Sequence, residues 1–135
     1  MKLKSFLNTR QGFTLIEIMA VLVILGVMAS VAVSKINDIS GTAELRALET
    51  GLSELNAREM LHWTNAKFAG GGWSGNGGDV GIWTDITPGG TIYLGSEYSW
   101  SVGPNRIGAS ALDFGSTSIP LNRLPSTNTS SAKWT

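Results

Sequence analysis

Cysteine is absent from the 135 residues of this chain, so the sequence provides neither a disulfide framework nor a thiolate metal site. Histidine occurs once, as His62, which excludes a zinc cluster or a catalytic triad built on histidines. Charge is also sparse, since 15% of residues are charged and ten basic side chains balance ten acidic ones. With no net charge and no convergent nucleophile, base and acid, we expect no nucleic-acid partner, no cofactor and no catalytic residue.

The few charges are unevenly placed at the N-terminus. Residues 1–12 carry three basic side chains and no acidic one, and the strongly apolar residues 13–33 follow them. A helix of that length spans about 31 Å, which matches the hydrocarbon core of a bilayer. The positive-inside rule keeps residues 1–12 in the cytoplasm, so the rest of the chain is exported.

The position of the small residue Gly12 distinguishes this N-terminal segment from an ordinary secretory signal. Such a signal ends in a small-x-small cleavage site after its apolar stretch, and no such site fits here. Gly12 instead precedes the stretch. A cut after Gly12 would remove the basic leader and leave the membrane anchor on the mature chain.

Glu17 is the one charge within the apolar segment. A carboxylate in hydrocarbon costs about 2.5–3.5 kcal/mol or more, unless it is paired, reaches the membrane surface or is protonated. A cut after Gly12 would supply a partner, because it creates an α-amine on Phe13, four residues away. In a bundle of identical helices, a salt bridge from Glu17 to its own or a neighbour's amine would neutralise both charges and set the axial register.

The run GFTLIE over Gly12–Glu17, with a basic leader before it and an apolar helix after it, resembles the class III signal of type IV pilins and type II secretion pseudopilins. The resemblance covers roughly residues 8–45. It implies that a membrane prepilin peptidase cuts between Gly12 and Phe13 and methylates the Phe13 amine. It also implies assembly roles for Phe13, Thr14 and Glu17, and an inner-membrane assembly platform as a partner.

The chain departs from that family at Ser34, because many members carry a proline near this position. A proline would remove a backbone hydrogen bond and kink the helix, so its absence predicts a straighter helix. Gly26 remains a weak point. Two interpretations stay open: Gly26 allows close packing of helices, or it marks where the helix melts in a filament.

Beyond Lys35, apolar residues recur at three- and four-residue steps, which is the helical period. They are Ile36, Ile39, Leu45, Leu48, Leu52 and Leu55. This leucine stripe predicts a helix that continues to about Phe68 with a domain packed on one face, and Gly41 and Gly51 weaken it. Arg46–Glu49 and Glu54–Arg58 have the spacing of ion pairs on the exposed side.

Gly70–Gly72 should end this helix, and residues 70–78 have the composition of a flexible connector. Short runs with strand character follow, separated by turns that contain glycine. They are Val80–Ile86, Thr91–Leu94, Tyr98–Val102 and Ala111–Phe114. We expect an antiparallel meander over the leucine stripe, and a surface loop or tail over residues 115–135, which are rich in Ser, Thr, Asn and Pro.

Trp83 and Trp100 lie in predicted strands and should build the small core, whereas Trp73 and Trp134 should be exposed or at a subunit contact. Four carboxylates of this region could offer oxygen ligands to calcium, but their spacing resembles no calcium loop, so we predict no metal site. They are Asp79, Asp85, Glu97 and Asp113.

These patterns predict an α+β fold: a long N-terminal α-helix, whose first half spans the membrane, with a small antiparallel β-sheet packed on its C-terminal half. The predicted segments are a cleaved leader, a membrane-spanning assembly half of the helix, an amphipathic half, and a β domain with its glycine-rich loop and tail. Their bounds are residues 1–12, 13–34, 35–69 and 70–135.

Together with the resemblance, the patterns predict a structural function: the major pilin-like subunit of a type IV pilus, a helical homo-oligomer. The precursor would wait in the inner membrane with its N-terminus in the cytoplasm, and the mature subunit would enter an extracellular pilus or a periplasmic pseudopilus. Two alternatives stay open, a pseudopilin of a type II secretion system and a monomeric single-pass membrane protein with an exported binding domain. Glu17 should distinguish the monomeric protein from the two filament subunits, because a carboxylate within the membrane only destabilises a lone anchor.

Overall fold

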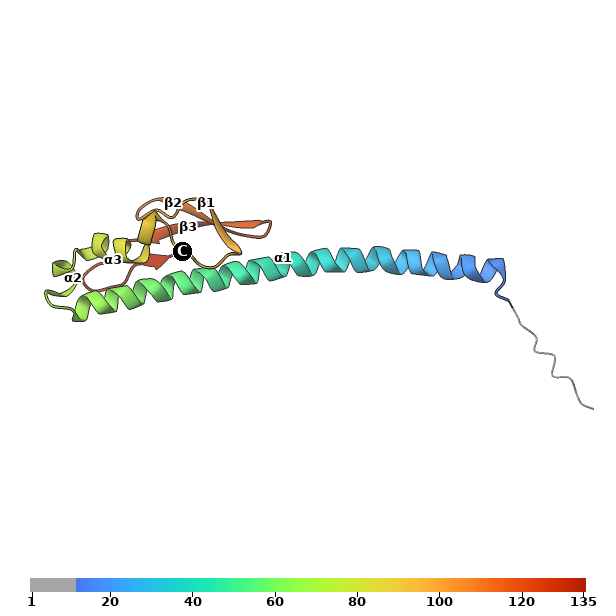
Figure 1. The fold of residues 1–135 in the computed structure, drawn as a ribbon, viewed down its shortest axis with the longest axis horizontal. Coiled ribbons are helices and arrows are strands. Elements are labelled where there is room, and N and C mark those ends of the chain that lie inside the picture. Colours follow the sequence, from blue (N-terminus) through green and yellow to red (C-terminus); the bar gives the residue numbers. More distant parts are fainter. Residues whose placement is uncertain (1–11) are drawn as a thin grey trace, which may run out of the picture. The chain divides into compact units, whose positions relative to one another are not determined.

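Helix α1 begins at Leu15 and ends at Phe68, which makes it 54 residues long. The computed structural model describes residues 12–135, and all other elements follow α1 in the chain. These are α2 (Gly72–Gly75), α3 (Gly78–Ile86), the 3-10 helix η1 (Pro88–Gly90), β1 (Tyr98–Val102), β2 (Ala109–Phe114), β3 (Thr117–Leu124) and β4 (Lys133–Trp134). The predicted α+β class, with one long N-terminal helix and a small antiparallel sheet, is confirmed (Figure 1).

The described residues belong to two units, of which one ends at Ile39 and the other runs from Ser40 to Thr135. In the first unit, every side chain from Gly12 to Ile39 is exposed. The helix is long and apolar enough to cross a membrane by length and composition. A helix that is apolar on all sides is typical of a membrane span or of the core of a large protein.

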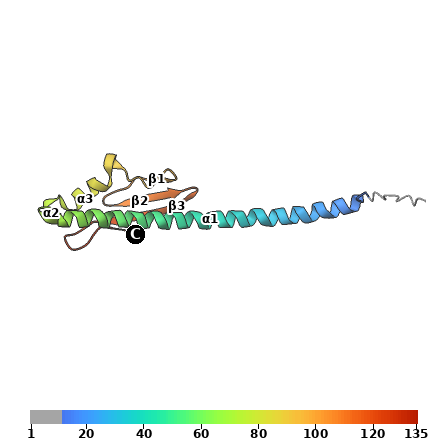
Figure 2. The ribbon, with the colours of Figure 1, turned by 60° about the horizontal axis from the view of Figure 1, so that its bottom comes forward.

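The core of the second unit lies between the C-terminal half of α1 and the elements that follow it (Figures 1 and 2). Leu48 and Leu55 are each 1% exposed, and the half-buried Leu52 packs against this core. The remaining buried members are Ile86, Ile92, Leu112, Leu121 and Trp134. The leucine stripe is therefore buried only from Leu48 onward, because its earlier residues are exposed. These are Ile36, Ile39 and Leu45, at 62%, 67% and 50% exposure.

Gly51 is a packing position rather than a weak point of the helix. A Cβ atom at residue 51 would lie 2.8 Å from Cε1 of Tyr98, so a larger residue would force the ring to move. The Tyr98 hydroxyl donates to the Ala47 carbonyl at 2.7 Å, which holds the ring against α1. Both predicted ion pairs on the exposed side are present, Arg46–Glu49 at 3.1 Å and Arg58–Glu54 at 2.7 Å.

The sheet is antiparallel in the order β1-β2-β3-β4, and two of the predicted strands, β1 and β2, are confirmed. The other two predictions are wrong. Val80–Ile86 is helical, as part of α3, and Thr91–Leu94 forms no strand. Ile82 and Ile86 are both buried at a spacing of one helical turn. A short apolar run fits a strand and a buried helix equally well, and burial along one helical face decides between them here.

Residues 115–135 are not a surface tail, as their composition had predicted. Strand β3 pairs with β2 in the register Leu112↔Ile119, and β4 pairs with the end of β3. Leu121 and Trp134 are 2% and 1% exposed, so the C-terminal segment completes the core. The polar composition concealed an alternation in β3, in which Ile119, Leu121 and Arg123 are the more buried positions.

Three tryptophans meet in the second unit, where the ring centroids of Trp83 and Trp100 lie 6.2 and 5.9 Å from that of Trp134. The predicted core roles of Trp83 and Trp100 are confirmed, although Trp83 belongs to α3, and the predicted exposure of Trp134 is wrong. Trp73 is half-buried, and its Nε1 donates to Ser126 Oγ at 3.2 Å. Trp73 belongs to α2, which lies within the segment predicted to be a flexible connector.

Candidate functional site

The start of α1 is defined by Thr14. Gly12, Phe13 and Thr14 have no regular secondary structure, and the helix begins at the next residue. The Thr14 carbonyl accepts hydrogen bonds from the N–H groups of Glu17 and Ile18, at 3.1 and 3.3 Å. The Thr14 hydroxyl also accepts from the Glu17 N–H, at 3.3 Å. Thr14 is therefore the N-cap, whose side chain satisfies a donor that the helix itself leaves free.

Glu17 completes the cap from the other side. Its Oε2 accepts from the Thr14 N–H at 3.2 Å and from the Thr14 hydroxyl at 3.3 Å. Threonine followed three residues later by glutamate is the capping-box pattern, and the positive end of the helix dipole also favours a carboxylate there. The spacing of Thr14 and Glu17 in the sequence already fits this pattern, but a capping role for Glu17 was not among the predictions. The carboxylate thus has partners in its own chain before any cut is made.

The predicted cleavage position lies just outside this cap. Gly12, Phe13, Thr14 and Glu17 line an open polar hollow of about 430 Å³. The Phe13 side chain is 80% exposed, and a Cβ atom built on Gly12 would meet no heavy atom within 4 Å. The fold of the described residues therefore does not itself require glycine at position 12. A requirement for glycine there would have to come from a partner that binds this segment.

The carboxylates considered as calcium ligands are used in other contacts. Asp79 binds two arginines, and Asp113 accepts from Ser101 Oγ at 2.9 Å. Glu97 accepts from Ser96 Oγ at 3.3 Å, and Oδ2 of Asp85 lies 4.0 Å from Nδ1 of His62. Over residues 12–135, no group of three or more His, Cys, Asp or Glu side chains is placed to hold a metal ion.

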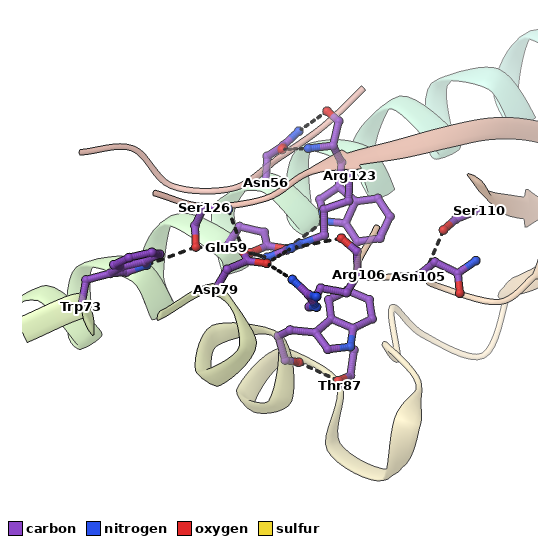
Figure 3. A network of polar contacts seen from close by, with 12 residues as sticks. Asn56, Glu59, Trp73, Asp79, Thr87, Asn105, Arg106, Ser110, Arg123 and Ser126 are labelled. Carbon is purple, nitrogen blue, oxygen red and sulfur yellow. Dashed lines mark hydrogen bonds and ion pairs between the residues drawn. The ribbon is translucent and has the colours of Figure 1, made fainter. Parts of the chain in front are cut away.

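A buried polar network is the second prominent feature (Figure 3). Arg123 binds Glu59 with two nitrogens, and its Nη2 donates to Glu59 Oε2 at 2.9 Å. Its Nη1 and Nη2 also donate to the two oxygens of Asp79, at 3.1 and 3.0 Å. The side chains of Arg123 and Glu59 are fully buried. Arg106 adds a second guanidinium, with Nη1 2.9 Å from Asp79 Oδ2, so two positive and two negative groups balance.

Hydrogen bonds keep Asp79 ionised within this network. Burial alone would raise the pKa of Asp79, but hydrogen bonds from Arg123, Ser126 and Arg106 outweigh it and lower the pKa to about 2. The network joins α1, α3 and β3 through Glu59, Asp79 and Arg123. The network was not predicted, because Arg123 lies in a segment that was expected to be a tail and its partners are distant in the chain. Since the central guanidinium is buried and fully partnered, the network serves to position these elements.

Comparison with known protein families identifies the N-terminal feature. Residues 7–33 match the family model described as the prokaryotic N-terminal methylation motif. The matched span contains Gly12, Phe13, the Thr14–Glu17 cap and most of the apolar segment, so the predicted resemblance to a class III signal is confirmed. No curated protein and no solved structure matches the chain.

Proposed function

We propose that this chain is the precursor of a type IV pilus subunit, cut between Gly12 and Phe13, methylated on the Phe13 amine and assembled into a filament through α1. The observation that carries the proposal is the match of residues 7–33 to the N-terminal methylation motif. The motif supports a pilin-like or pseudopilin precursor with a membrane-anchoring helix. Because the glycine precedes the apolar segment, processing leaves that segment on the mature subunit.

The exposed apolar side chains of the first unit support two successive environments for this helix, the bilayer and then the filament. In the precursor, bilayer lipid would surround the apolar side chains between Phe13 and Val33, with residues 1–12 in the cytoplasm. In the filament, the same side chains must be covered by other copies once the subunit leaves the membrane. Association within lipid has no hydrophobic driving force and depends on close packing, which small residues such as Gly26, Ala29 and Ser30 allow.

The second half of α1 also offers a surface to neighbouring copies. Met60, Leu61 and Phe68 are 60%, 58% and 87% exposed. The Thr64 hydroxyl on this helix donates to the Met60 carbonyl at 2.7 Å, so it does not need water as a partner. Burial of such side chains contributes about 1.5–3 kcal/mol each when it is complete. Contacts along the whole length of α1 would therefore stabilise a filament.

A single helix also benefits from the capping box, so the presence of Glu17 does not by itself distinguish a filament subunit from a lone anchor. Both hydrogen bonds from Thr14 end on Oε2 of Glu17. We propose that the other oxygen, Oε1, pairs with the amine that a cut would create on Phe13 of the same chain or of a neighbour. In this proposal Glu17 has two roles, helix capping in the precursor and charge pairing in the filament.

Mass spectrometry of the mature protein tests the proposal. We expect a chain that begins at Phe13 and carries one N-methyl group, and we expect Gly12→Val to block processing and leave the precursor in the membrane. A mature chain that begins at Met1, or beyond residue 33, would refute the processing step. Filaments sheared from the cell surface would support a pilus, whereas mature protein confined to the cell envelope would favour the second candidate, a secretion pseudopilin.

A further inference from the structure

The distance along the chain between the helix start and the predicted scissile bond is short. Gly12 and Phe13 lie outside α1, and only Thr14 separates them from the first helical residue, Leu15. Whether the Gly12–Phe13 peptide bond is extended or helical therefore depends on where the helix begins. Among the described residues, the side-chain contacts at this start are those between Thr14 and Glu17.

Proteolysis acts on open, non-helical backbone. When opening and closing are fast relative to cleavage, the cleavage rate follows the population of the open form. A helix that began one turn earlier would include the Gly12–Phe13 bond and would lower that population. The residue that stops the helix at Leu15 therefore influences processing without contacting the reacting atoms.

The Thr14 hydroxyl helps to fix the residue at which α1 begins. Without it, the Glu17 N–H would lose one of its two acceptors and keep only the Thr14 carbonyl, so a helix that starts at Leu15 would be less stable. Extending the helix toward the N-terminus would shift the free donors onto residues nearer the aqueous side, where water satisfies them. Loss of the cap therefore favours the longer helix and the covered bond.

We infer that Thr14 is a positioning residue for processing: its hydroxyl, as the N-cap of α1, keeps the Gly12–Phe13 bond out of the helix and available to the peptidase. The inference rests on the proposed function, and it gives Thr14 a task in the precursor that is separate from any contact in the filament. Glu17 has a smaller share in this task. Its own N–H would still reach the Thr14 hydroxyl if its carboxylate were removed.

Matched substitutions at position 14 test the inference. Val keeps the branched shape of Thr and loses the hydroxyl, whereas Ser keeps the hydroxyl and loses the methyl group. The full-length precursor in detergent micelles is incubated with prepilin peptidase, and the cleavage rate is followed by mass spectrometry. We expect Thr14→Ser to match the wild type and Thr14→Val to be cut more slowly, by at most about five-fold, because loss of one N-cap shifts the helix-start equilibrium by that factor.

A second measurement separates helix position from direct recognition of the side chain. The carbonyl ¹³C shifts of Gly12 and Phe13 in the same micelles should be non-helical in the wild type and in Thr14→Ser, and should move toward helical values in Thr14→Val. Equal cleavage of all three proteins would overturn the inference, and so would slow cleavage of Thr14→Val without the change in shift. If the wild-type precursor is not cut between Gly12 and Phe13 at all, the proposed function itself fails.

Discussion

The side chain of Asn56 pairs with the backbone of Trp134 as a neighbouring strand would. Its Nδ2 donates to the Trp134 carbonyl at 3.2 Å, and its Oδ1 accepts from the Trp134 N–H at 2.8 Å. The indole Nε1 of Trp134 also donates to Oε1 of Glu59 at 3.1 Å. Both partners lie on α1, so the penultimate residue of the chain is bound to the long helix. In a domain without cysteine, these contacts take the place of a covalent link between the C-terminus and the core.

Trp134→Ala should lower the free energy of unfolding of the second unit by about 3–5 kcal/mol, because it removes a large buried ring and leaves a cavity. Near-ultraviolet circular dichroism of the full chain in detergent micelles, followed through a denaturant titration, measures this. The control is Lys133→Ala, an exposed neighbour in the same strand, which should change stability by less than about 0.5 kcal/mol. Similar effects for the two variants would contradict the placement of Trp134 in the core.

Arg123→Met should also lower the free energy of unfolding by about 3–5 kcal/mol, but for an electrostatic reason. It leaves the carboxylates of Glu59 and Asp79 buried without their central partner. Adding Glu59→Met and Asp79→Asn to Arg123→Met should recover part of the loss, because an apolar replacement of a buried charge cluster is often tolerated. Arg106→Met serves as the control and should lower the free energy of unfolding by less, because the Arg106 side chain is 35% exposed. A triple variant no more stable than Arg123→Met would show that packing, rather than charge balance, limits this site.

The second unit should lose stability in acid. The pKa of Asp79 falls from 3.8 in the unfolded chain to about 2 in the fold, so the fold favours the ionised form. The stabilisation is complete above about pH 4 and is lost as the pH falls toward 2, because the unfolded chain then binds a proton that the folded chain excludes. Asp79→Asn should be less stable at neutral pH and should show a shallower decline between these pH values. The decline should not vanish, because hydrogen bonds from Thr117 and Ser116 also lower the pKa of Glu44.

Local patterns were sufficient to predict the N-terminal half of the molecule. The apolar run, the basic leader and Glu17 identify the signal, and the helical period of Leu48, Leu52 and Leu55 predicts both the length of α1 and its packed face. Helices of this kind depend on contacts between residues three or four positions apart, which a sequence displays directly. The strands β1 and β2 were also predicted, as short runs with strand character.

The C-terminal part could not be predicted in this way, because distant partners decide it. Arg123 is buried only because Glu59, on α1, and Asp79, on α3, lie opposite it. Nothing in the segment around Arg123 indicates those partners, and its Ser, Thr and Asn content is typical of a surface loop. The burial of Trp134 was equally hard to predict, because it depends on contacts with residues that are distant in the chain.

The assembly role of Glu17 can now be tested apart from its capping role. Glutamine is accepted at this position of a capping box, so Glu17→Gln keeps a side chain that can receive the Thr14 N–H but removes the charge. Glu17→Ala removes both. We expect both variants to insert into the membrane and to be cut at nearly the normal rate, because the Thr14 hydroxyl still caps the helix in each.

Filament assembly should fail in both variants or become very inefficient. A cut after Gly12 leaves a positive amine on Phe13, and in an apolar bundle that amine is uncompensated unless a carboxylate meets it. The measurement is the amount of subunit in sheared filaments relative to membranes, with the normal processing machinery present. Normal filaments from Glu17→Gln together with none from Glu17→Ala would show that capping, and not charge pairing, is what assembly requires. If both variants assemble normally, the carboxylate has no assembly role. A variant that enters filaments only alongside wild-type subunits would place the salt bridge between neighbouring chains, because each unpaired amine would then lie within reach of an intact Glu17.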